Sequence, residues 1–323
     1  MTISSELKRI KRLRSLFSRD AASVAVGIGD DAAVLALTVA GSDNLVWTVD
    51  VQVDGTHFRT DWVSWEDVGW RSFMAAASDL AAMGAEPVAV LSSLILASSV
   101  DDEALDALAR GQALAADELG VPIVGGNLAR GTETSVTTTL LGRSAKPVLR
   151  TGARPGDNLW LAGSVGIARA GLALVEEHME DARMQDDDTL ACLNAWRRPF
   201  ARIADGRALA GIAHAAIDIS DGLAHDAWQL AEASNVRLVL DRAAVLEAGG
   251  EALAAGAHVT GCDALELALI GGEDYALLAA SAAPLPGFLQ IGTVEAHVEG
   301  PRLFMKTARG TVPLEPRGFD HFA

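Results

Sequence analysis

Strand-like and helix-like segments alternate along this chain in two groups, and a turn-rich stretch at residues 143–155 separates the groups. This stretch contains Pro147 and Pro155, which interrupt regular backbone structure. Interspersed strands and helices predict an α+β, α/β-like fold in two domains, which we place at residues 1–145 and 146–323. Hydrophobic residues make up 50% of the 323 positions, so each domain can bury a core.

The first domain is expected to contain a mixed sheet. Apolar and β-branched runs bounded by turn residues predict strands at residues 24–26, 32–37, 45–53, 88–97, 121–124 and 134–142. The long apolar run at 88–97 predicts a buried strand. The strand at 121–124 is expected to end at the glycine pair Gly125-Gly126, because glycine favours turns.

Helices are expected to accompany this sheet. Ser64 has a side chain suited to an N-cap, and Gly84 is a suitable stop for the helix that follows Ser64. A second helix is predicted at 101–119, closed by Gly120. Basic and apolar residues at helical spacing predict an amphipathic helix within residues 1–20, which lacks the continuous apolar stretch of an export signal.

The second domain alternates in the same way. Strands are predicted at residues 158–162, 236–240, 275–280 and 289–294, and residues 217–220 are expected to form a strand or a tight turn. Helices are predicted through Leu174 and at 221–233, and the acidic tract at 176–188 is expected to be a solvated loop. Both domains therefore mix the two kinds of element.

The charge of the chain restricts its partners. With 43 acidic and 26 basic residues the formal net charge is −17, which argues against general affinity for nucleic acids or anionic membranes. A partner that carries phosphate would need cations as intermediaries. Cys192 and Cys262 are the two cysteines, and they predict free thiols in a reducing cytoplasm rather than a disulfide framework.

Short acidic motifs occur where predicted strands give way to turns or helices. They are Gly29-Asp30-Asp31, Thr48-Val49-Asp50, Ser78-Asp79 and Asp218-Ile219-Ser220-Asp221. Carboxylate oxygens are hard ligands, and Mg²⁺ binds through a few of them together with water and substrate phosphates. One such motif alone is more often an ordinary turn or helix start. The recurrence of the motifs predicts a metal site assembled from distant segments.

Two glycine pairs precede polar residues, at Gly125-Gly126-Asn127 and at Gly271-Gly272-Glu273. Glycine lets backbone amides approach a phosphate, but an ordinary turn explains either pair alone. The chain contains neither a Walker sequence nor a dinucleotide-binding fingerprint. His57 follows a strand end and is a candidate ligand contact, although a lone histidine near a loop is more often structural.

Taken together and in this order, the motifs resemble those of the thiamine-monophosphate kinase family, in the superfamily of aminoimidazole ribonucleotide synthetase. The resemblance runs nearly end to end and rests on Gly27-Ile28-Gly29-Asp30-Asp31-Ala32, Thr48-Val49-Asp50, Asp54-Gly55-Thr56-His57-Phe58, residues 78–87, Gly125-Gly126-Asn127, residues 150–157, residues 218–223, Gly271-Gly272-Glu273-Asp274-Tyr275 and Gly318-Phe319-Asp320-His321-Phe322. The last two segments separate this family from its superfamily relatives.

The resemblance implies ATP-dependent phosphorylation of thiamine monophosphate to thiamine diphosphate, in a homodimer whose N-terminal sheets pack together. It implies several Mg²⁺ ions, with the metal-binding positions Asp30, Asp31, Thr48, Val49, Asp50, Asp79, Asn127, Asp218 and Asp221. Asp30 would be either a ligand or a support for its neighbour. The resemblance implies ATP contacts at Gly126, Asn127, Arg150 and Ser220, and thiamine monophosphate contacts at His57, Glu273 and Phe319.

The sequence departs from the family pattern at two of these positions. Asn127 stands where an aspartate is common, and its amide oxygen can coordinate Mg²⁺ but carries no charge. Phe319 stands where a larger aromatic residue is often found, so the stacking face is smaller.

The absence of an evident activated serine or cysteine favours direct in-line transfer over a phosphoenzyme. Two alternatives remain beside the kinase. The chain could be another ATP-dependent enzyme of the superfamily, although we find no catalytic cysteine near the N-terminus. It could also be a non-catalytic binder that lost turnover through Asn127.

Overall fold

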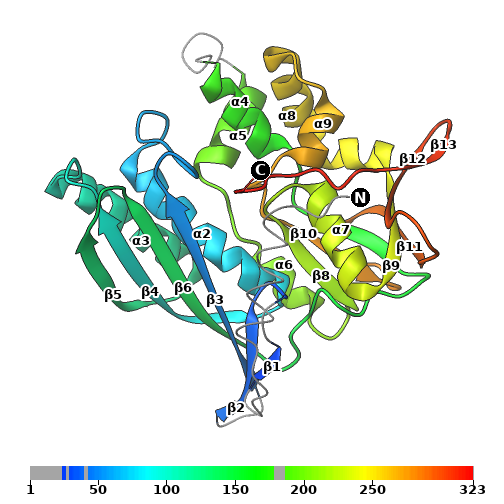
Figure 1. Cartoon of the computed structure of the whole chain (residues 1–323), viewed down its shortest axis with the longest axis horizontal. Coiled ribbons are helices and arrows are strands. Elements are labelled where there is room, and N and C mark those ends of the chain that lie inside the picture. Colours follow the sequence, from blue (N-terminus) through cyan, green and yellow to red (C-terminus); the bar gives the residue numbers. More distant parts are fainter. Residues whose placement is uncertain (1–23, 27–28, 40–42, 178–185, 323) are drawn as a thin grey trace.

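The computed structural model describes residues 24–26, 29–39, 43–177 and 186–322. Two mixed β-sheets, each accompanied by helices, form separate halves of the molecule, one in the blue-to-green part of Figure 1 and one in the green-to-red part. The expected two-domain α+β fold is therefore confirmed. The helix predicted within residues 1–20 lies outside the described residues, and the division after residue 145 stays a prediction.

The first sheet has six strands in the order β1-β2-β3-β6-β4-β5. Its strands are β1 (Val24–Val26), β2 (Ala33–Val39), β3 (Asp43–Val53), β4 (Glu86–Leu96), β5 (Ile123–Arg130) and β6 (Ser135–Ser144). Neighbouring strands are antiparallel except for β4 and β5, which run parallel. A parallel pair needs a crossover connection, which helix α3 (Asp102–Leu119) supplies.

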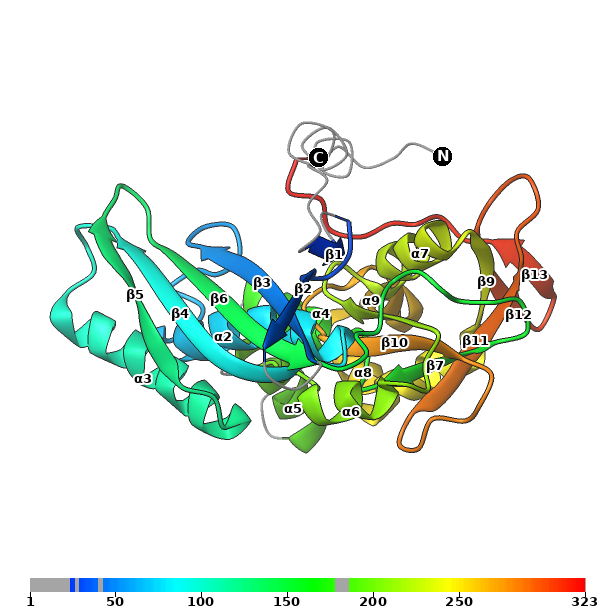
Figure 2. The same ribbon diagram turned by 90° about the horizontal axis from the view of Figure 1, so that it is seen from below.

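Helices α2 (Trp65–Ala82) and α3 cover one face of this sheet, as Figure 2 shows. The predicted N-cap of α2 is present, because the side chain of Ser64 accepts a hydrogen bond from a backbone N–H in the first turn, and Asp101 caps α3 in the same way. Gly69 of α2 and Gly111 of α3 bring the helices close together. An added Cβ there would lie 2.0 and 1.8 Å from a backbone oxygen of the other helix.

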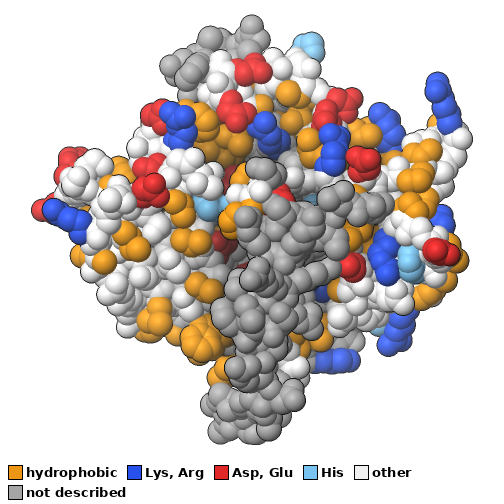
Figure 3. Space-filling model, in the orientation of Figure 1, with side chains coloured by type: hydrophobic (Ala, Val, Ile, Leu, Met, Phe, Trp, Pro, Cys, Tyr) orange, Lys and Arg blue, Asp and Glu red, His pale blue; other side chains and the backbone are white. Residues whose placement is uncertain are grey.

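No helix among the described residues packs on the opposite face of the first sheet, and we call it the outer face. Side chains alternate between the two faces of a strand, so β3 directs Thr48 and Asp50 inward and its intervening residues outward. Large exposed apolar side chains on the outer face are Trp47, Val49, Val51, Leu91 and Ile95. Figure 3 shows orange side chains over this part of the molecule. The prediction that strand 88–97 is buried is wrong for the single chain, because β4 has only one covered face.

Strand β5 corrects a second prediction. The strand continues through Gly125 and Gly126 to Arg130, so this glycine pair does not form a turn. A Cβ at Gly126 would lie 1.7 Å from the backbone oxygen of Ser92 on β4. Glycine therefore permits the close approach of a neighbouring strand at this position.

The second sheet has seven strands in the order β13-β12-β9-β11-β7-β10-β8. They are β7 (Asn158–Ala162), β8 (Ala215–Ile219), β9 (Val236–Asp241), β10 (Ala276–Ser281), β11 (Leu289–Ala296), β12 (Leu303–Thr307) and β13 (Gly310–Pro313). Only β9 and β12 are parallel neighbours. The strands predicted in this half are confirmed, and β12 and β13 are additional.

Helices of the second half are α4 (Ile167–Glu176), α5 (Asp187–Arg197), α6 (Ile203–Leu209), α7 (Leu223–Ser234), α8 (Arg242–Thr260) and α9 (Ala264–Ile270). The acidic tract is not all loop, because Asp186 caps α5 and its next two aspartates form the first turn. The sequence reasoning did not predict α6, α8 or α9. Among the described helices none passes alone as a membrane span, whereas α8 and α9 pass as a pair bent by 112°.

Helix α2 joins the two halves. The indole N–H of Trp70 donates to the backbone oxygen of Pro199 at 2.7 Å, and the hydroxyl of Ser78 donates to Asp218 on β8 at 2.6 Å. An added Cβ at Gly206 of α6 would lie 2.0 Å from the backbone oxygen of Ala81. The inner side of α2 therefore faces the site that lies between the sheets.

Candidate active site

Three aspartates from distant segments meet where the two sheets approach each other. Asp31 precedes β2, Asp79 lies on α2 and Asp218 lies on β8. Each offers a carboxylate oxygen, and these oxygens lie within 4.8 Å of one another. We call these three residues the carboxylate cluster. The structure thus brings together three of the residues that the acidic motifs predicted.

Hydroxyl groups orient two members of the cluster. Thr48 of β3 donates to Asp79, and Ser78 donates to Asp218 at 2.6 Å. Both hydroxyls are buried, so each fixes one carboxylate oxygen and leaves the other for a further partner. Thr48 therefore supports a predicted ligand in this structure.

Arg150 supplies positive charge beside the cluster. Its guanidinium donates to both carboxylate oxygens of Asp31, at 2.9 and 2.7 Å, and to Gln229 at 3.0 Å. Its backbone N–H approaches both carboxylate oxygens of Asp30 at 3.2 Å, and Asp30 also accepts from the N–H of Asp31 at 3.0 Å. Asp30 thus holds the backbone on both sides of this ion pair.

The aspartates in this region carry more negative charge than the nearby cationic side chains offset. Burial, followed by the charge of Asp31, raises the pKa values of Asp79 and Asp218 well above their usual range. Burial raises the pKa of Asp30 to about 6, with a further contribution from Asp31. Carboxylates that resist ionisation in this way need additional positive charge to remain anionic at neutral pH.

The donor set fits a hard divalent cation. Three carboxylates lie close enough to share one ion, and their preferences suit Mg²⁺ or a similar cation rather than a metal that needs thiolates or imidazoles. Burial and neighbouring carboxylates raise the pKa values of Asp79 and Asp218, and a bound cation would lower them by favouring the ionised forms.

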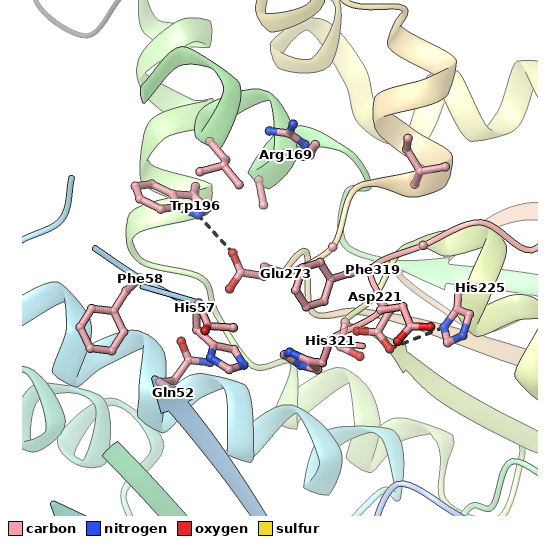
Figure 4. Close-up of a pocket in the computed structure, with 18 of the residues that line it drawn as sticks. Gln52, His57, Phe58, Arg169, Trp196, Asp221, His225, Glu273, Phe319 and His321 are labelled. Carbon is pink, nitrogen blue, oxygen red and sulfur yellow. Dashed lines mark hydrogen bonds and ion pairs between the residues drawn. The ribbon is translucent and has the colours of Figure 1, made fainter. Parts of the chain in front are cut away.

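A cavity of about 1060 Å³ lies next to the cluster, between the two halves. Residues in its lining are Asp50, His57, Trp196, Asp221, Glu273 and Phe319. Figure 4 shows His57, Glu273, Phe319 and Asp221 around the same space. Burial raises the pKa of Asp50 to about 6, and Asp50 in turn raises the pKa of Asp79. Asp50 therefore links the cavity to the carboxylate cluster.

The loop after β8 carries two further predicted site residues, Ser220 and Asp221, into the cavity lining. One carboxylate oxygen of Asp226 accepts hydrogen bonds from three consecutive backbone N–H groups, those of Ser220, Asp221 and Gly222, at 3.0, 3.1 and 3.2 Å. A single anion thus fixes the loop. Asp221 and Asp226 also form a group with His225, whose Nδ1 lies 3.5 and 3.3 Å from their respective carboxylates.

His57 belongs to an aromatic group at the mouth of the cavity. Its Nδ1 accepts from the N–H of Val53 at 3.1 Å, which leaves Nε2 to carry the proton of the neutral ring. Burial, followed by nearby His321, lowers its pKa. The ring of His321 lies 4.8 Å from that of His57 and 4.7 Å from that of Phe319. His57 is therefore placed as a neutral hydrogen-bond donor.

Glu273 lies on the glycine-rich loop between α9 and β10. Its φ of 64° is in the left-handed region, which a residue other than glycine seldom adopts without support. Support comes from Arg71, which forms an ion pair with one carboxylate oxygen, and from Trp196, whose indole N–H donates to the other at 3.1 Å. The backbone N–H of Glu273 donates to Ser220 at 2.8 Å. The loop is thus tied to both domains.

The final segment of the chain crosses the cavity. The backbone N–H of Phe319 donates to the backbone oxygen of Asp221 at 3.0 Å, so the predicted aromatic contact is attached to the loop after β8. Figure 2 shows this red segment passing from the second sheet toward the first. Residues that lie at opposite ends of the sequence therefore share one cavity.

Three predicted positions lie away from this cavity within one chain. Val49 directs its side chain to the outer face and is 61% exposed, so only its backbone is available for a ligand role on the inner side. Gly126 and Asn127 lie on β5, which β6 and β4 separate from β3. Neither residue lines the cavity.

Sequence reasoning missed several residues that build the site. Arg71, Trp196, Asp226 and Gln229 were not predicted to contribute. Arg71 offered a signal, since it is a charged residue in an otherwise apolar stretch of α2. Trp196 and Gln229 offered no such signal, because their partners lie far away in the sequence. Asp226 offered none because an aspartate in the first turn of a helix is common.

Two family models match this chain, one in each half. Residues 29–144 match the family described as AIR synthase related protein, N-terminal domain, and residues 154–299 match AIR synthase related protein, C-terminal domain. The two halves of the chain are thus an N-terminal and a C-terminal domain of the AIR synthase related proteins.

Relatives with similar sequences identify the family within this class. Thiamine-monophosphate kinase of Mycobacterium tuberculosis is 37% identical over 287 residues, which cover 88% of this chain and 82% of that protein. The Escherichia coli protein of the same name is 33% identical over 315 residues, with 93% of both chains covered. The chain belongs to the thiamine-monophosphate kinase family.

Solved structures support the same family. A structure described as AaThiL complexed with AMPPCP and TMP has a TM-score of 0.86 and 29% identity, covering 100% of this chain and 99% of the other. Thiamine monophosphate kinase from Aquifex aeolicus gives a TM-score of 0.78 at 29% identity, with 94% and 98% covered. Hydrogenase maturation protein HypE shares the fold, with a TM-score of 0.67 at 21% identity over 87% and 90% of the chains.

Proposed function

We propose that this protein transfers the γ-phosphate of ATP to thiamine monophosphate and releases thiamine diphosphate and ADP. The observation that carries the proposal is the carboxylate cluster beside a cavity lined by His57, Glu273 and Phe319. Membership of the family and the resemblance to a relative complexed with AMPPCP and TMP support the same reaction.

The metal in this proposal is Mg²⁺. Asp31, Asp79 and Asp218 would hold it, and Asp50 and Asp221 are two further predicted ligands that line the cavity. When bound, Mg²⁺ supplies the positive charge that offsets repulsion between the two phosphate substrates and the acidic protein. Arg150 contributes a fixed cation at the same place, oriented by Asp31.

The protein groups position the acceptor and need not activate it strongly. A phosphate monoester has a second pKa of about 6, so its oxygen is already mostly deprotonated near neutral pH. His57, as a neutral donor, and Glu273, as an acceptor, would orient the substrate, while the exposed ring of Phe319 offers a stacking face. Holding the acceptor oxygen in line with the γ-phosphate is then the main task of the chain.

The assembly we propose is a homodimer formed through the outer face. Its apolar side chains are exposed on a continuous sheet, and exposed apolar patches of this kind are typical of interaction surfaces. Asn127 lies on β5 beside Ser93, on the side of the sheet that carries this face. Its proposed role as a ligand therefore depends on the assembled dimer rather than on one chain.

We also propose a role for each domain and a cellular location for the protein. We keep residues 1–145 as the ATP, magnesium and dimerisation domain and residues 146–323 as the domain that completes the substrate site. We place the protein in the cytoplasm without nucleic-acid or membrane partners. Among the described residues, the cysteines Cys192 and Cys262 form no disulfide, which suits a reducing compartment.

Product analysis tests the proposed reaction. Purified protein is incubated with ATP, Mg²⁺ and thiamine monophosphate, and both nucleotides and thiamine esters are separated by chromatography. Equal amounts of ADP and thiamine diphosphate are expected. Binding of both substrates without product would favour the non-catalytic binder instead. ADP formation that does not depend on thiamine monophosphate would favour another enzyme of the superfamily.

A further inference from the structure

Arg71 lies beneath the cavity and does not line it. The residue is on α2, its side chain is 1% exposed, and its guanidinium reaches groups from the first and the second half of the chain. A buried cation of this kind is costly unless its donors are paired, so its contacts indicate what the position requires.

The guanidinium of Arg71 contacts the supports of the cavity wall. It donates to the backbone oxygen of Trp196 at 2.5 Å, to the backbone oxygen of His57 at 3.2 Å, and to a carboxylate oxygen of Glu273. It also lies 5.0 Å from the ring of Trp196. The three partners belong to α5, to the loop after β3 and to the glycine-rich loop, and all three line the cavity.

Trp196 holds the same carboxylate as Arg71. Its indole N–H donates to the second carboxylate oxygen of Glu273 at 3.1 Å, as the dashed line in Figure 4 shows. Each oxygen of Glu273 is therefore held by one protein donor. A carboxylate can accept about four hydrogen bonds, so acceptor capacity remains on the cavity side.

We propose that Arg71 is a positioning residue that adapts the cavity to thiamine monophosphate, acting through Glu273 and the backbone of His57. The inference rests on the proposed kinase function and deepens it. Arginine suits this role because its planar fork donates in several fixed directions at once, whereas the lysine ammonium is a single charged point on a flexible stem. ATP, which we place at the carboxylate cluster, should be affected much less.

Arg198 provides a matched control. It also joins α5 to α2, through Glu66 at 2.6 Å and through Asp67, and it lies 5.8 Å from the ring of Trp70. Its chemistry therefore parallels that of Arg71, with carboxylate partners and an indole. Arg198 is partly exposed and does not line the cavity, so a general effect of loosening the contact between α2 and α5 should appear in both variants.

The first experiment measures steady-state kinetics of Arg71→Lys and Arg198→Lys in the full chain. For Arg71→Lys we expect the KM for thiamine monophosphate to rise about tenfold or more, as for the loss of one charge-assisted hydrogen bond, with the KM for ATP changed by less than about twofold. Arg198→Lys should change neither. Equal changes in both KM values, or equal effects of the two variants, would overturn the proposal.

Trp196→Phe keeps an aromatic ring but removes the N–H that holds Glu273, so it tests the same mechanism if Arg71→Lys folds poorly. We expect the same selective rise in the KM for thiamine monophosphate. A circular dichroism spectrum and melting temperature close to wild type would show that the fold persists. An unchanged KM in a folded Trp196→Phe protein would count against the positioning of Glu273.

A double-mutant cycle shows whether Arg71 acts through Glu273. If it does, Arg71→Lys should add little to the effect of Glu273→Gln on the KM for thiamine monophosphate. Fully additive effects would overturn this route. The outcome is separate from that of the proposed function, because a wild-type protein without kinase activity refutes the function, whereas an active wild type with an unaffected Arg71→Lys variant refutes only the inference.

Discussion

Arg150 donates two hydrogen bonds, at 2.9 and 2.7 Å, to the two carboxylate oxygens of Asp31. The side chain of Asp31 is completely buried and that of Arg150 is 19% exposed, so the pair lies largely away from solvent. The ion pair orients one member of the carboxylate cluster and adds a positive charge to it. Its removal should therefore affect stability as well as catalysis.

Replacement of Arg150 by alanine should destabilise the protein by roughly 3 to 5 kcal/mol, because it leaves a buried carboxylate without its partner. Added Mg²⁺ should recover part of this loss. Chemical denaturation with and without Mg²⁺ measures both effects. Arg143→Ala, which removes an exposed pair with Glu86, should cost at most about 1 kcal/mol and show no Mg²⁺ recovery. Equal losses in the two variants would contradict the role given to Arg150.

Stability without metal should depend on pH through Asp50. Its pKa is raised from 3.8 to about 6 in the folded protein, so ionisation opposes folding, and stability should fall as the pH rises from about 4 through about 6. Asp50→Asn removes this penalty. At pH 8 the metal-free variant should be more stable than wild type by at most about 3 kcal/mol, and the difference should vanish near pH 3.

The same Asp50→Asn variant should lose activity although its fold is retained. Turnover at saturating Mg²⁺ should fall by about a hundredfold or more, because the variant loses a charge that would lie near the transferring phosphate in the proposed reaction. Asp54→Asn, just after the same strand, serves as the control, since Asp54 does not line the central cavity. An unchanged steady-state rate in Asp50→Asn would remove Asp50 from the active site.

A charge on the outer face should prevent dimer formation. Leu91→Glu places a carboxylate on β4 at an exposed apolar position, and desolvating it in an interface would be unfavourable. Sedimentation velocity should detect a dimer in the wild type and a monomer in the variant. Leu114→Glu, on the exposed side of α3, should remain dimeric. A dimer that persists in Leu91→Glu would exclude this part of the face.

Loss of the Asp226 carboxylate should release the loop that carries Ser220 and Asp221. Asp226→Ala leaves three backbone N–H groups without their acceptor, which should cost about 1 to 3 kcal/mol and raise the Mg²⁺ concentration needed for half-maximal activity. Asp263→Ala removes an N-cap of α9 and should cost about 1 kcal/mol. The Mg²⁺ requirement of this control should be unchanged, and a similar shift in both variants would show a nonspecific effect.

Asn127→Asp tests the position where the family pattern is broken. If Asn127 contributes to a metal site in the dimer, the added charge should lower the Mg²⁺ concentration for half-maximal activity. A magnesium titration of the initial rate measures this shift. The assignment of Asn127 as a ligand would fail if the titration curve stayed in place while the protein remained dimeric.

The sequence revealed the acidic residues because their local signals were strong. Asp31, Asp79 and Asp218 each stand beside an apolar strand or helix, where an unbalanced carboxylate is unusual, and the structure gathers them. Helix limits were also predictable, since Ser64 and Asp101 cap their helices through bonds that span only three residues. Such features depend on neighbours in the sequence.

The supporting contacts depended on the tertiary fold and were not predicted. Arg71 meets Glu273 across 202 positions, and nothing near either residue specifies the pairing. The glycine pair in β5 was misread for a related reason, because its close neighbour is β4 rather than a ligand or a turn. The buried character expected for β4 depends on whatever covers the outer face, which the sequence of one strand does not specify.

Helix α2 contributes to both halves at once, through Trp70, Arg71 and Ser78. Removing either half would expose apolar and charged groups of this helix to water. The chain should therefore unfold in a single cooperative transition rather than domain by domain. Exchange of one domain between relatives would require matching replacements along α2. Substitutions in α2 and in the residues of the second half that contact it are therefore expected to occur together.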